Sequence, residues 1–284
     1  MISTCHQYNL RQKRLQDDLE KLDFDYKILT PKHFSLKKEF FSNEIKMFIE
    51  RYEWLGTIGV YPKWIFTARY KNILCGVVLI NEPTAYSKLL GDDTPRYEAL
   101  IQRGACISWS PKGLASRLIM FSCRWMVKNT NKRFFVAYSD PEAGEVGIVY
   151  QACNFDFLGN SFGASKMYIH DEFKGGLPFS SQTLNRTSTL KLWAGINGIS
   201  LEKEWIKENG FKNLNNIPEK IKECWKCWKK KVIEESITIF KEKKGKYAYV
   251  LGNSKKELKE LKKLKNYKTK EYPKRIVTDN VYKR

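Results

Sequence analysis

Residues 100–116 read LIQRGACISWSPKGLAS, and this stretch decides which fold class the chain can adopt. Its apolar first part, residues 100–109, predicts a buried strand, and a helical pattern follows the break after Trp109. In that pattern Ser110 is the expected N-cap and Pro111 the expected first helical residue. Apolar side chains then recur at helical spacing, at Leu114, Leu118, Phe121 and Trp125. A strand that leads directly into a helix indicates an α/β domain.

Gly113 lies in the first turn of this expected helix, where glycine costs about 1 kcal/mol relative to alanine. Close approach of a ligand to the backbone is one reason to keep a glycine there. The free amides and the helix dipole make such a helix end an anion site, well suited to a pyrophosphate. The candidate anion-binding residues are Ser110, Lys112, Gly113, Ala115 and Ser116.

The next informative stretch, residues 137–155, reads AYSDPEAGEVGIVYQACNF. It predicts a strand end, a turn and a short helix, with Asp140 and Tyr150 on either side of the turn. Asn154 is expected to stop the helix, because asparagine adopts the left-handed conformation more readily than most residues. Asp140 before a proline is also a common helix N-cap, so a structural role and a catalytic role are both open.

Working outward, the pattern predicts a helix within residues 33–56, strands at 63–71, 72–81, 133–139 and 161–170, and a turn at Lys71-Asn72. This order predicts a mixed α/β domain of residues 42–170, preceded by a helical segment, residues 1–41. Residues 171–284 are predicted to form a basic, helical extension.

Charge is concentrated near the end of the chain. The net charge is +20, and residues 241–284 contain 16 basic and five acidic side chains. Such an excess attracts a polyanion such as DNA, although a solvated lysine-rich tail has the same composition. Residues 194–200, AGINGIS, are compatible with a DNA-reading helix-turn-helix or with a plain helical hairpin.

The cysteines do not indicate a metal site. Cys224 and Cys227 form one Cys-x-x-Cys pair, but a structural zinc requires four ligands and no second pair lies nearby. The other cysteines lie in apolar segments and suit buried thiols in a reducing cytoplasm. The longest apolar run, residues 73–80, is far too short to span a membrane.

Two of these motifs resemble those of GCN5-related acetyltransferases. Ser110-x-x-Gly113-x-Ala115 is similar to the acyl-CoA loop of that family, with Ser110 in place of the usual Gln or Arg. Tyr150 followed by Asn154-Phe155 is similar to the family's Tyr, three residues, then Gly-Phe. The resemblance implies a mixed sheet flanked by helices and an acetyl-CoA or related acyl-CoA donor.

A narrower resemblance covers roughly residues 54–159. The segments RGACISWSPKGLASRLIMFSCRWMVKNT and FFVAYSDPEAGEVGIVYQACNFDFLG resemble the Mom family of phage DNA-modification proteins. That family converts adenine in DNA to its N6-carbamoylmethyl form, which protects phage DNA from restriction. The resemblance implies that Asp140 and Tyr150 form the catalytic pair, that DNA is the partner and that the protein acts in the host cytoplasm.

Two other functions remain open at this stage. One is a conventional acetyl-CoA-dependent N-acyltransferase acting on a protein or a small amine. The other is a non-catalytic DNA-binding protein that retains the fold. If a target base enters the site, Trp109, Tyr138 or Phe155 are candidates to stack on it.

Overall fold

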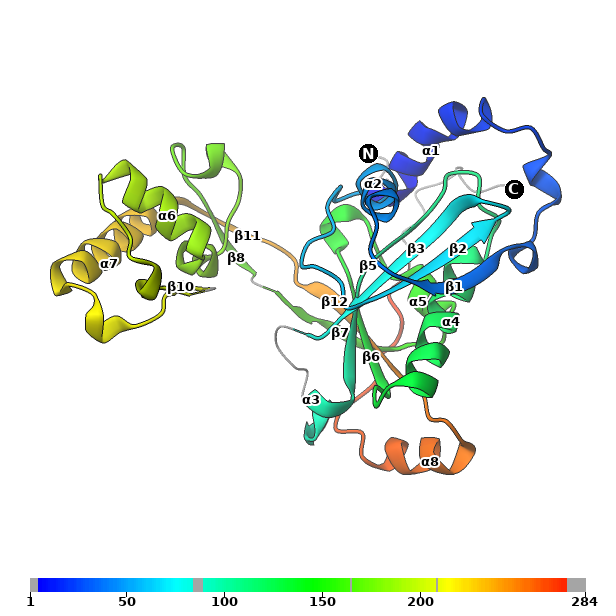
Figure 1. Ribbon diagram of the computed structural model, residues 1–284. Helices are drawn as coiled ribbons and strands as arrows, with labels where there is room; N and C mark the ends of the chain where they lie inside the picture. Colours follow the sequence, from blue (N-terminus) through cyan, green and yellow to red (C-terminus); the bar gives the residue numbers. More distant parts are fainter. Residues whose placement is uncertain (1–4, 84–88, 164, 208, 275–284) are drawn as a thin grey trace. The chain divides into compact units, whose positions relative to one another are not determined.

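The chain forms two compact units (Figure 1). This computed structural model describes residues 5–83, 89–163, 165–207 and 209–274. Unit 1 comprises Met1–Phe162 and Lys244–Arg284, and unit 2, Gly163–Lys243, is inserted between them. The expected boundaries at residues 41 and 170 therefore need correction. The segment before residue 42 belongs to unit 1, and the extension expected from residue 171 is divided between the two units.

Unit 1 is built around a seven-stranded sheet with the strand order β1-β2-β3-β5-β6-β12-β7. The strands are β1 (Ser35–Glu39), β2 (Trp64–Tyr70), β3 (Ile73–Asn81), β5 (Glu98–Cys106), β6 (Phe134–Ser139), β7 (Asp156–Phe162) and β12 (Lys244–Val250). β5 and β6 are parallel, whereas the other neighbouring pairs are antiparallel. The mixed α/β class predicted from the sequence is confirmed, as is the turn at Lys71, which has a φ of 51°.

Helices cover both faces of this sheet, with α1 and α2 above the strands and α4 below them in Figure 1. The helices of unit 1 are α1 (His6–Leu19), α2 (Asn43–Tyr52), α3 (Thr94–Tyr97), α4 (Leu114–Asn129), α5 (Ile148–Gln151) and α8 (Lys255–Lys263); a short strand, β4 (Leu89–Asp92), precedes α3. α2 packs against β3 and β5, and α4 packs against β2 and β3. The predicted apolar stripe of α4 supplies core residues, since Leu114 and Leu118 are fully buried.

The helix predicted within residues 33–56 is only partly correct. α2 begins after Ser42, whose hydroxyl accepts a hydrogen bond from the backbone N–H of Ile45 at 3.3 Å. Residues 35–39 instead form β1, which pairs along its whole length with β2. Pairing with the sheet edge therefore overrides the local helical spacing in this segment.

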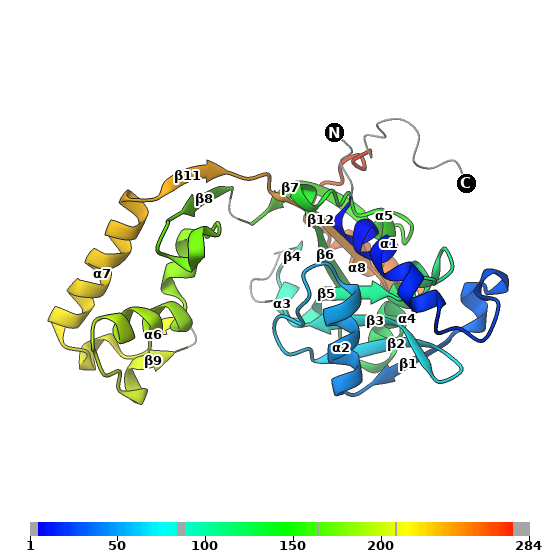
Figure 2. The ribbon, with the colours of Figure 1, turned by 90° about the horizontal axis from the view of Figure 1, so that it is seen from above.

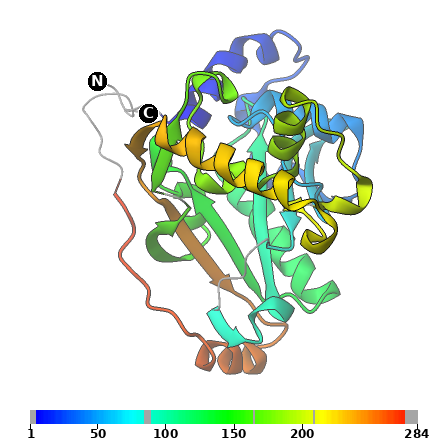
Figure 3. The same ribbon diagram turned by 90° about the vertical axis from the view of Figure 1, so that its left-hand side faces the viewer.

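The expectation that everything after residue 170 is helical is wrong. β12 lies between β6 and β7 and pairs with both of them. Beyond α8 the chain runs back alongside β7 (Figure 3), where the Lys270 backbone N–H donates to the Phe157 carbonyl at 2.7 Å. The Tyr272 hydroxyl donates to the Phe155 carbonyl at 2.8 Å. The lysine-rich segment up to residue 274 is thus part of the folded unit.

Unit 2 has a small core of its own, in which α6 and α7 pack against each other (Figure 2). Its elements are β8 (Lys166–Ile169), α6 (Thr187–Ile196), β9 (Ile206–Lys207), β10 (Gly210–Phe211), α7 (Glu219–Glu234) and β11 (Ile237–Phe240). The buried rings of Trp193 and Trp225 lie 5.0 Å apart. The strand expected at 161–170 divides into the end of β7 and β8, and β8 pairs with β11.

The helix-turn-helix and the helical hairpin expected around residues 194–200 are both wrong. α6 ends at Ile196, and Gly198 shortly after it has a φ of 62°, as the turn requires. A 3-10 turn (Lys203–Trp205) and the β9–β10 ribbon follow, however, and α7 begins only at Glu219. In the described part of the chain, none of the helices has the length and apolar character needed to cross a membrane.

Candidate functional site

A cavity of about 550 Å³ lies in unit 1 where the parallel strands β5 and β6 separate. The two strands are paired only from Glu98 to Leu100 and from Phe134 to Val136, although β5 continues to Cys106 and β6 to Ser139. A register shift between β3 and β5 lies at the point of divergence, and such a bulge bends the strand that contains it. The walls come from the diverging strands, α1, α4, the loop after α2, and the turn that leads into α5.

Two side chains of β5 form hydrogen bonds with a loop on the side away from β6, and this keeps the space between the strands open. The Gln102 amide donates to the carbonyls of Ile58 and Val60, both at 2.9 Å. Arg103 donates through Nε to the Thr57 carbonyl at 3.2 Å. These bonds hold the end of β5 against the loop of residues 57–60.

Asp140 and Tyr150, the predicted catalytic pair, both line the cavity. Asp140 follows β6 and caps a 3-10 turn (Pro141–Ala143), because its Oδ1 accepts the Glu142 backbone N–H at 3.2 Å. Its Oδ2 lies 3.0 Å from Nζ of Lys244 in β12. The structural role foreseen for Asp140 is therefore present together with a position on the cavity wall.

Tyr150 is carried by the short helix α5, which begins after Gly147 in a left-handed conformation with a φ of 65°. Its ring packs against Tyr247 and Phe155, with centroids 5.4 and 5.6 Å away. Burial, reinforced by the negative charge of Glu145, raises the pKa of Tyr150 well above its ordinary value of 10, so the phenol stays protonated. None of the residues described in the structure forms a hydrogen bond with this hydroxyl. Asn154 ends the segment with a φ of 59°, as predicted.

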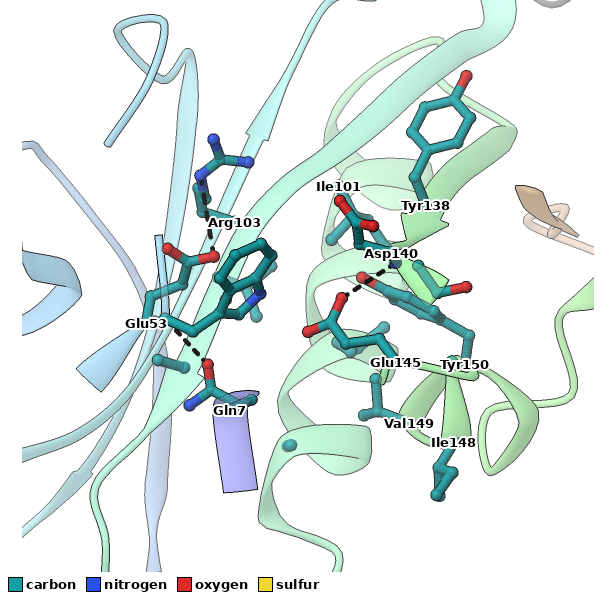
Figure 4. A pocket seen from close by; sticks show the side chains of 18 of the residues that line it. Gln7, Glu53, Ile101, Arg103, Tyr138, Asp140, Glu145, Ile148, Val149 and Tyr150 are labelled. Carbon is teal, nitrogen blue, oxygen red and sulfur yellow. Dashed lines mark hydrogen bonds and ion pairs between the residues drawn. The ribbon is translucent and has the colours of Figure 1, made fainter. Parts of the chain in front are cut away.

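Two further carboxylates line the cavity, and the sequence analysis missed both (Figure 4). Glu145 Oε2 accepts the Asp140 backbone N–H at 3.2 Å, and the Trp54 side chain lies beside the Glu145 carboxyl group. Glu53 Oε2 accepts the Leu55 backbone N–H at 2.9 Å, and its Oε1 lies 4.0 Å from Nε of Arg103. Burial raises the pKa of both carboxyl groups above the usual 4.5. Glu145 could have been noticed from its position within the 137–155 stretch, whereas Glu53 follows α2 without any local signal.

The predicted anion loop is only partly as expected. The helix begins at Leu114 rather than Pro111, and Gly113 precedes it with a φ of 90°, which is the reason that glycine is needed there. Ser110 is buried and does not cap the helix. Its carbonyl instead accepts a hydrogen bond at 2.6 Å from Arg11 of α1.

Of the five candidate anion-binding residues, only Ala115 lines the cavity. Lys112 is exposed, and the Ser116 hydroxyl donates to the Gly113 carbonyl at 3.0 Å. Helix geometry leaves the amides of Ala115 and Ser116 without an intrahelical acceptor. Those amides, the helix dipole and the Lys112 ammonium fit the pyrophosphate of an acyl-CoA, and Ala115 connects this loop with the cavity.

Among the three aromatic residues considered for base stacking, only Tyr138 lines the cavity. Trp109 is buried against Phe24, with ring centroids 5.6 Å apart. Phe155 is fully buried and stacks on Tyr249 at 4.9 Å. The expectation that Trp109 or Phe155 meets a ligand is therefore wrong.

The structure contains no group of three or more His, Cys, Asp or Glu side chains arranged for a metal, within the residues that it describes. Cys224 and Cys227 are exposed on α7. Cys106 lines the cavity, but burial raises its pKa to about 12, so the thiol is a poor nucleophile at neutral pH.

Comparison with known proteins finds one matching family model and several similar structures. Residues 51–189 match the model of the Mom protein family. An acetyltransferase from Bacillus subtilis, solved in complex with CoA, is 12% identical, with a TM-score of 0.35 over 77% of this chain and 99% of that one. The ribosomal-protein-S5-alanine acetyltransferase from Vibrio fischeri is 15% identical, with a TM-score of 0.33 over 50% of this chain and 87% of that one. No curated protein sequence matches this chain.

Proposed function

Since residues 51–189 of this chain match the model of the Mom protein family, we propose that it transfers an acyl-derived carbamoylmethyl group to the N6 amine of adenine in DNA. The observation that carries this proposal is the cavity between β5 and β6, where Asp140, Glu145 and Tyr150 face a common space. Its volume of about 550 Å³ lies within the range of small-molecule sites.

The chemistry needs a proton acceptor and a proton donor close to the reacting amine. The N6 amine of adenine is a weak nucleophile because its lone pair is delocalised into the ring, so positioning and proton transfer must supply much of the rate. Tyr150 lines the cavity and is protonated at neutral pH, so it can donate a proton to a leaving group. A carboxylate on the cavity wall takes the proton of the amine.

An acyl-CoA donor would be held at the start of α4. The amides of Ala115 and Ser116 and the side chain of Lys112 are the groups available there for its pyrophosphate. When bound, the donor would supply the group to be transferred, and the cavity beyond Ala115 would receive that end of the donor.

The target adenine must leave the base stack to enter such a cavity, which costs a few kcal/mol in a duplex. Tyr138 is half-buried on the wall and is the aromatic residue placed to stack on an extruded base. Lys244, on the same wall, supplies a positive charge near the entering nucleotide.

The charge distribution supports DNA as the polymer that carries the adenine. Residues 244–284 contain 14 basic and four acidic residues, whereas unit 2 contains 15 and 10. Most of the excess positive charge therefore belongs to unit 1, which contains the cavity. Lysines of this kind bind the phosphate backbone without reading the sequence, and their contribution falls with salt.

The test is nucleoside mass spectrometry on plasmid DNA from cells that express the protein. We expect a new adenine nucleoside with the added mass of the carbamoylmethyl group, and resistance of that plasmid to restriction enzymes that cut at adenine-containing sites. Asp140→Ala should abolish the new species, and Tyr150→Phe should reduce its rate of formation by about 100-fold or more.

Tyr249→Phe is the matched control for Tyr150→Phe. It removes a hydroxyl from the same aromatic cluster but lies outside the cavity, so the modification should persist. Unmodified adenine from cells with abundant folded protein would refute the proposal. Acylation of a small amine by the purified protein and acetyl-CoA would then favour the conventional N-acyltransferase.

A further inference from the structure

We propose that Glu145 is the general base that takes the proton of the attacking amine, and that Asp140 is a positioning residue that fixes the loop carrying Glu145. This inference rests on the proposed function, because it assigns roles within the same cavity. It departs from the expectation that Asp140 forms the catalytic pair with Tyr150.

Asp140 is poorly placed to act as a base because both of its carboxylate oxygens are already engaged. Oδ1 accepts the Glu142 backbone N–H at 3.2 Å, and Oδ2 is paired with the Lys244 ammonium at 3.0 Å. The Asp140 carbonyl also accepts the backbone N–H groups of Ala143 and Glu145, at 3.1 and 3.0 Å. These four contacts hold the turn after β6 in one conformation, which is a positioning role.

Glu145 lies at the end of this turn and faces the cavity (Figure 4). Its hydrogen bond comes from a neutral donor, the Asp140 backbone N–H, and the Trp54 side chain beside it is also neutral. No lysine or arginine among the described residues lies within ion-pair distance of Glu145. A buried carboxylate without a cationic partner gains more from accepting a proton than one that is already paired.

The charged and titratable groups around Glu145 further favour its protonated form over its ionised form. Asp140 on its own turn, Glu53 after α2 and Tyr150 on α5 all interact with it, and Lys244 of β12 is the more distant cation. Burial is the main reason that the pKa of Glu145 is raised, and the Asp140 carboxylate adds to it. The pKa of Glu145 is thereby shifted towards neutral pH, and a general base is most effective when its pKa lies near the operating pH.

Glu53 is the other carboxylate of the cavity, and its contacts indicate a different role. Its Oε1 faces the Arg103 guanidinium at 4.0 Å, and its Oε2 accepts the Leu55 backbone N–H at 2.9 Å. Both oxygens are thus occupied, one of them by a cation. Glu53 orients Arg103 on the wall opposite Glu145.

The proton balance of the proposed step is simple. The amine nitrogen bonds to the methylene carbon of the donor's carbamoylmethyl group, and its proton passes to the Glu145 carboxylate. The bond between that carbon and the donor's leaving atom breaks, its electron pair leaves with that atom, and Tyr150 donates its proton to it. Transfer of the proton from the Glu145 carboxyl group to the Tyr150 phenolate restores both side chains.

The experiment measures how fast modified adenine accumulates in plasmid DNA after induction, by nucleoside mass spectrometry. Glu145→Gln keeps the size and an acceptor oxygen but cannot take a proton, and we expect a loss of about 100-fold or more. Glu142→Gln makes the same chemical change on an exposed residue of the same turn that does not line the cavity, and it should retain the wild-type rate.

Asp140 is tested by comparing two substitutions at that position. Asp140→Asn keeps an oxygen that can accept the Glu142 N–H, whereas Asp140→Ala does not. A positioning role predicts that asparagine recovers much of the rate that alanine loses. A base role predicts that both variants are equally inactive, and that result would overturn the inference.

The remaining outcomes are also decisive. A wild-type rate in folded Glu145→Gln overturns the assignment of the base. If Glu145→Gln does not fold, Glu145→Asp retains the charge but retracts it by one methylene; a reduced rate supports the inference and a wild-type rate contradicts it. Absence of modified adenine with the wild-type protein would instead reject the proposed function itself.

Discussion

Gly147 offers the sharpest test of how this fold positions its site. It has a φ of 65°, and a Cβ added there would lie 2.5 Å from Cε2 and Cζ of Tyr247 and 2.7 Å from its hydroxyl oxygen. Tyr247 cannot easily move, because its ring is fully buried and its hydroxyl donates to the Val146 carbonyl at 2.7 Å. The prediction is that Gly147→Ala destabilises unit 1 and displaces α5 together with Tyr150.

The size of the effect follows from two contributions. The left-handed backbone costs an alanine about 1–2 kcal/mol, partly offset by about 0.4–1 kcal/mol from the smaller entropy of the unfolded chain. Overpacking against the Tyr247 ring adds about 1–3 kcal/mol. Gly91→Ala is the matched control, because Gly91 has a φ of 64° and no heavy atom within 4 Å of the added Cβ. It should show the backbone cost without the overpacking.

The assay is native-state hydrogen exchange of the β6 and β12 amides, read by mass spectrometry, which reports the opening free energy of unit 1 separately from unit 2. Gly147→Ala should lower that free energy by about 1–3 kcal/mol more than Gly91→Ala does. It should also reduce adenine modification, whereas Gly91→Ala should not. Equal destabilisation by the two substitutions would show that Tyr247 does not constrain this helix.

Three further predictions concern pH and the C-terminal segment. The pKa of Glu145 is raised on folding, so ionisation of this carboxyl group destabilises the native state as pH rises above 4.5. Glu145→Gln should therefore raise the melting temperature at neutral pH. Equal stabilisation by this substitution at pH 4 would contradict the prediction. The pKa of Glu39 is lowered mainly by its hydrogen bonds with Arg69, so this pair stabilises the fold above pH 4.5 and loses its effect as pH falls below 4.5. In thermal melts, the destabilisation caused by Arg69→Gln should therefore become smaller as pH falls below 4.5. Deleting residues 265–284 removes the hydrogen bonds of Tyr267 with Asp156 and of Tyr272 with Phe155, and should lower the stability of unit 1 by about 2 kcal/mol. The deletion also removes lysines, so DNA binding should depend less steeply on salt concentration in gel-shift titrations.

Local signals in the sequence predicted the elements whose conformation depends on neighbouring residues. The strands at β2, β3 and β6 and the turn at Lys71 follow from apolar patterning and turn chemistry. Asn154 ends its helical segment for the same local reason. Asp140 and Tyr150 could be paired because one short stretch contains both, and the fold brings both to the cavity.

Other features depend on contacts between distant segments, and local patterning misjudged them. β1 was expected to be helical, yet the edge of β2 draws it into the sheet. The lysine-rich stretch after residue 243 was expected to continue a helical extension, but β12 inserts between β6 and β7. Pairing with a strand about a hundred residues earlier in the chain cannot be recognised from the pattern of a ten-residue segment.

The sequence by itself determined the fold class, the resemblance to the Mom family and the stretch that carries the candidate chemistry, because each is encoded in residues close together along the chain. Only the tertiary structure decided which carboxylates share the cavity and how each is paired. Glu53 comes from the end of α2, Glu145 from the turn after β6 and Lys244 from the start of β12. Their charges affect one another through space, so the roles of Asp140 and Glu145 become distinguishable only once the sheet has brought these segments together.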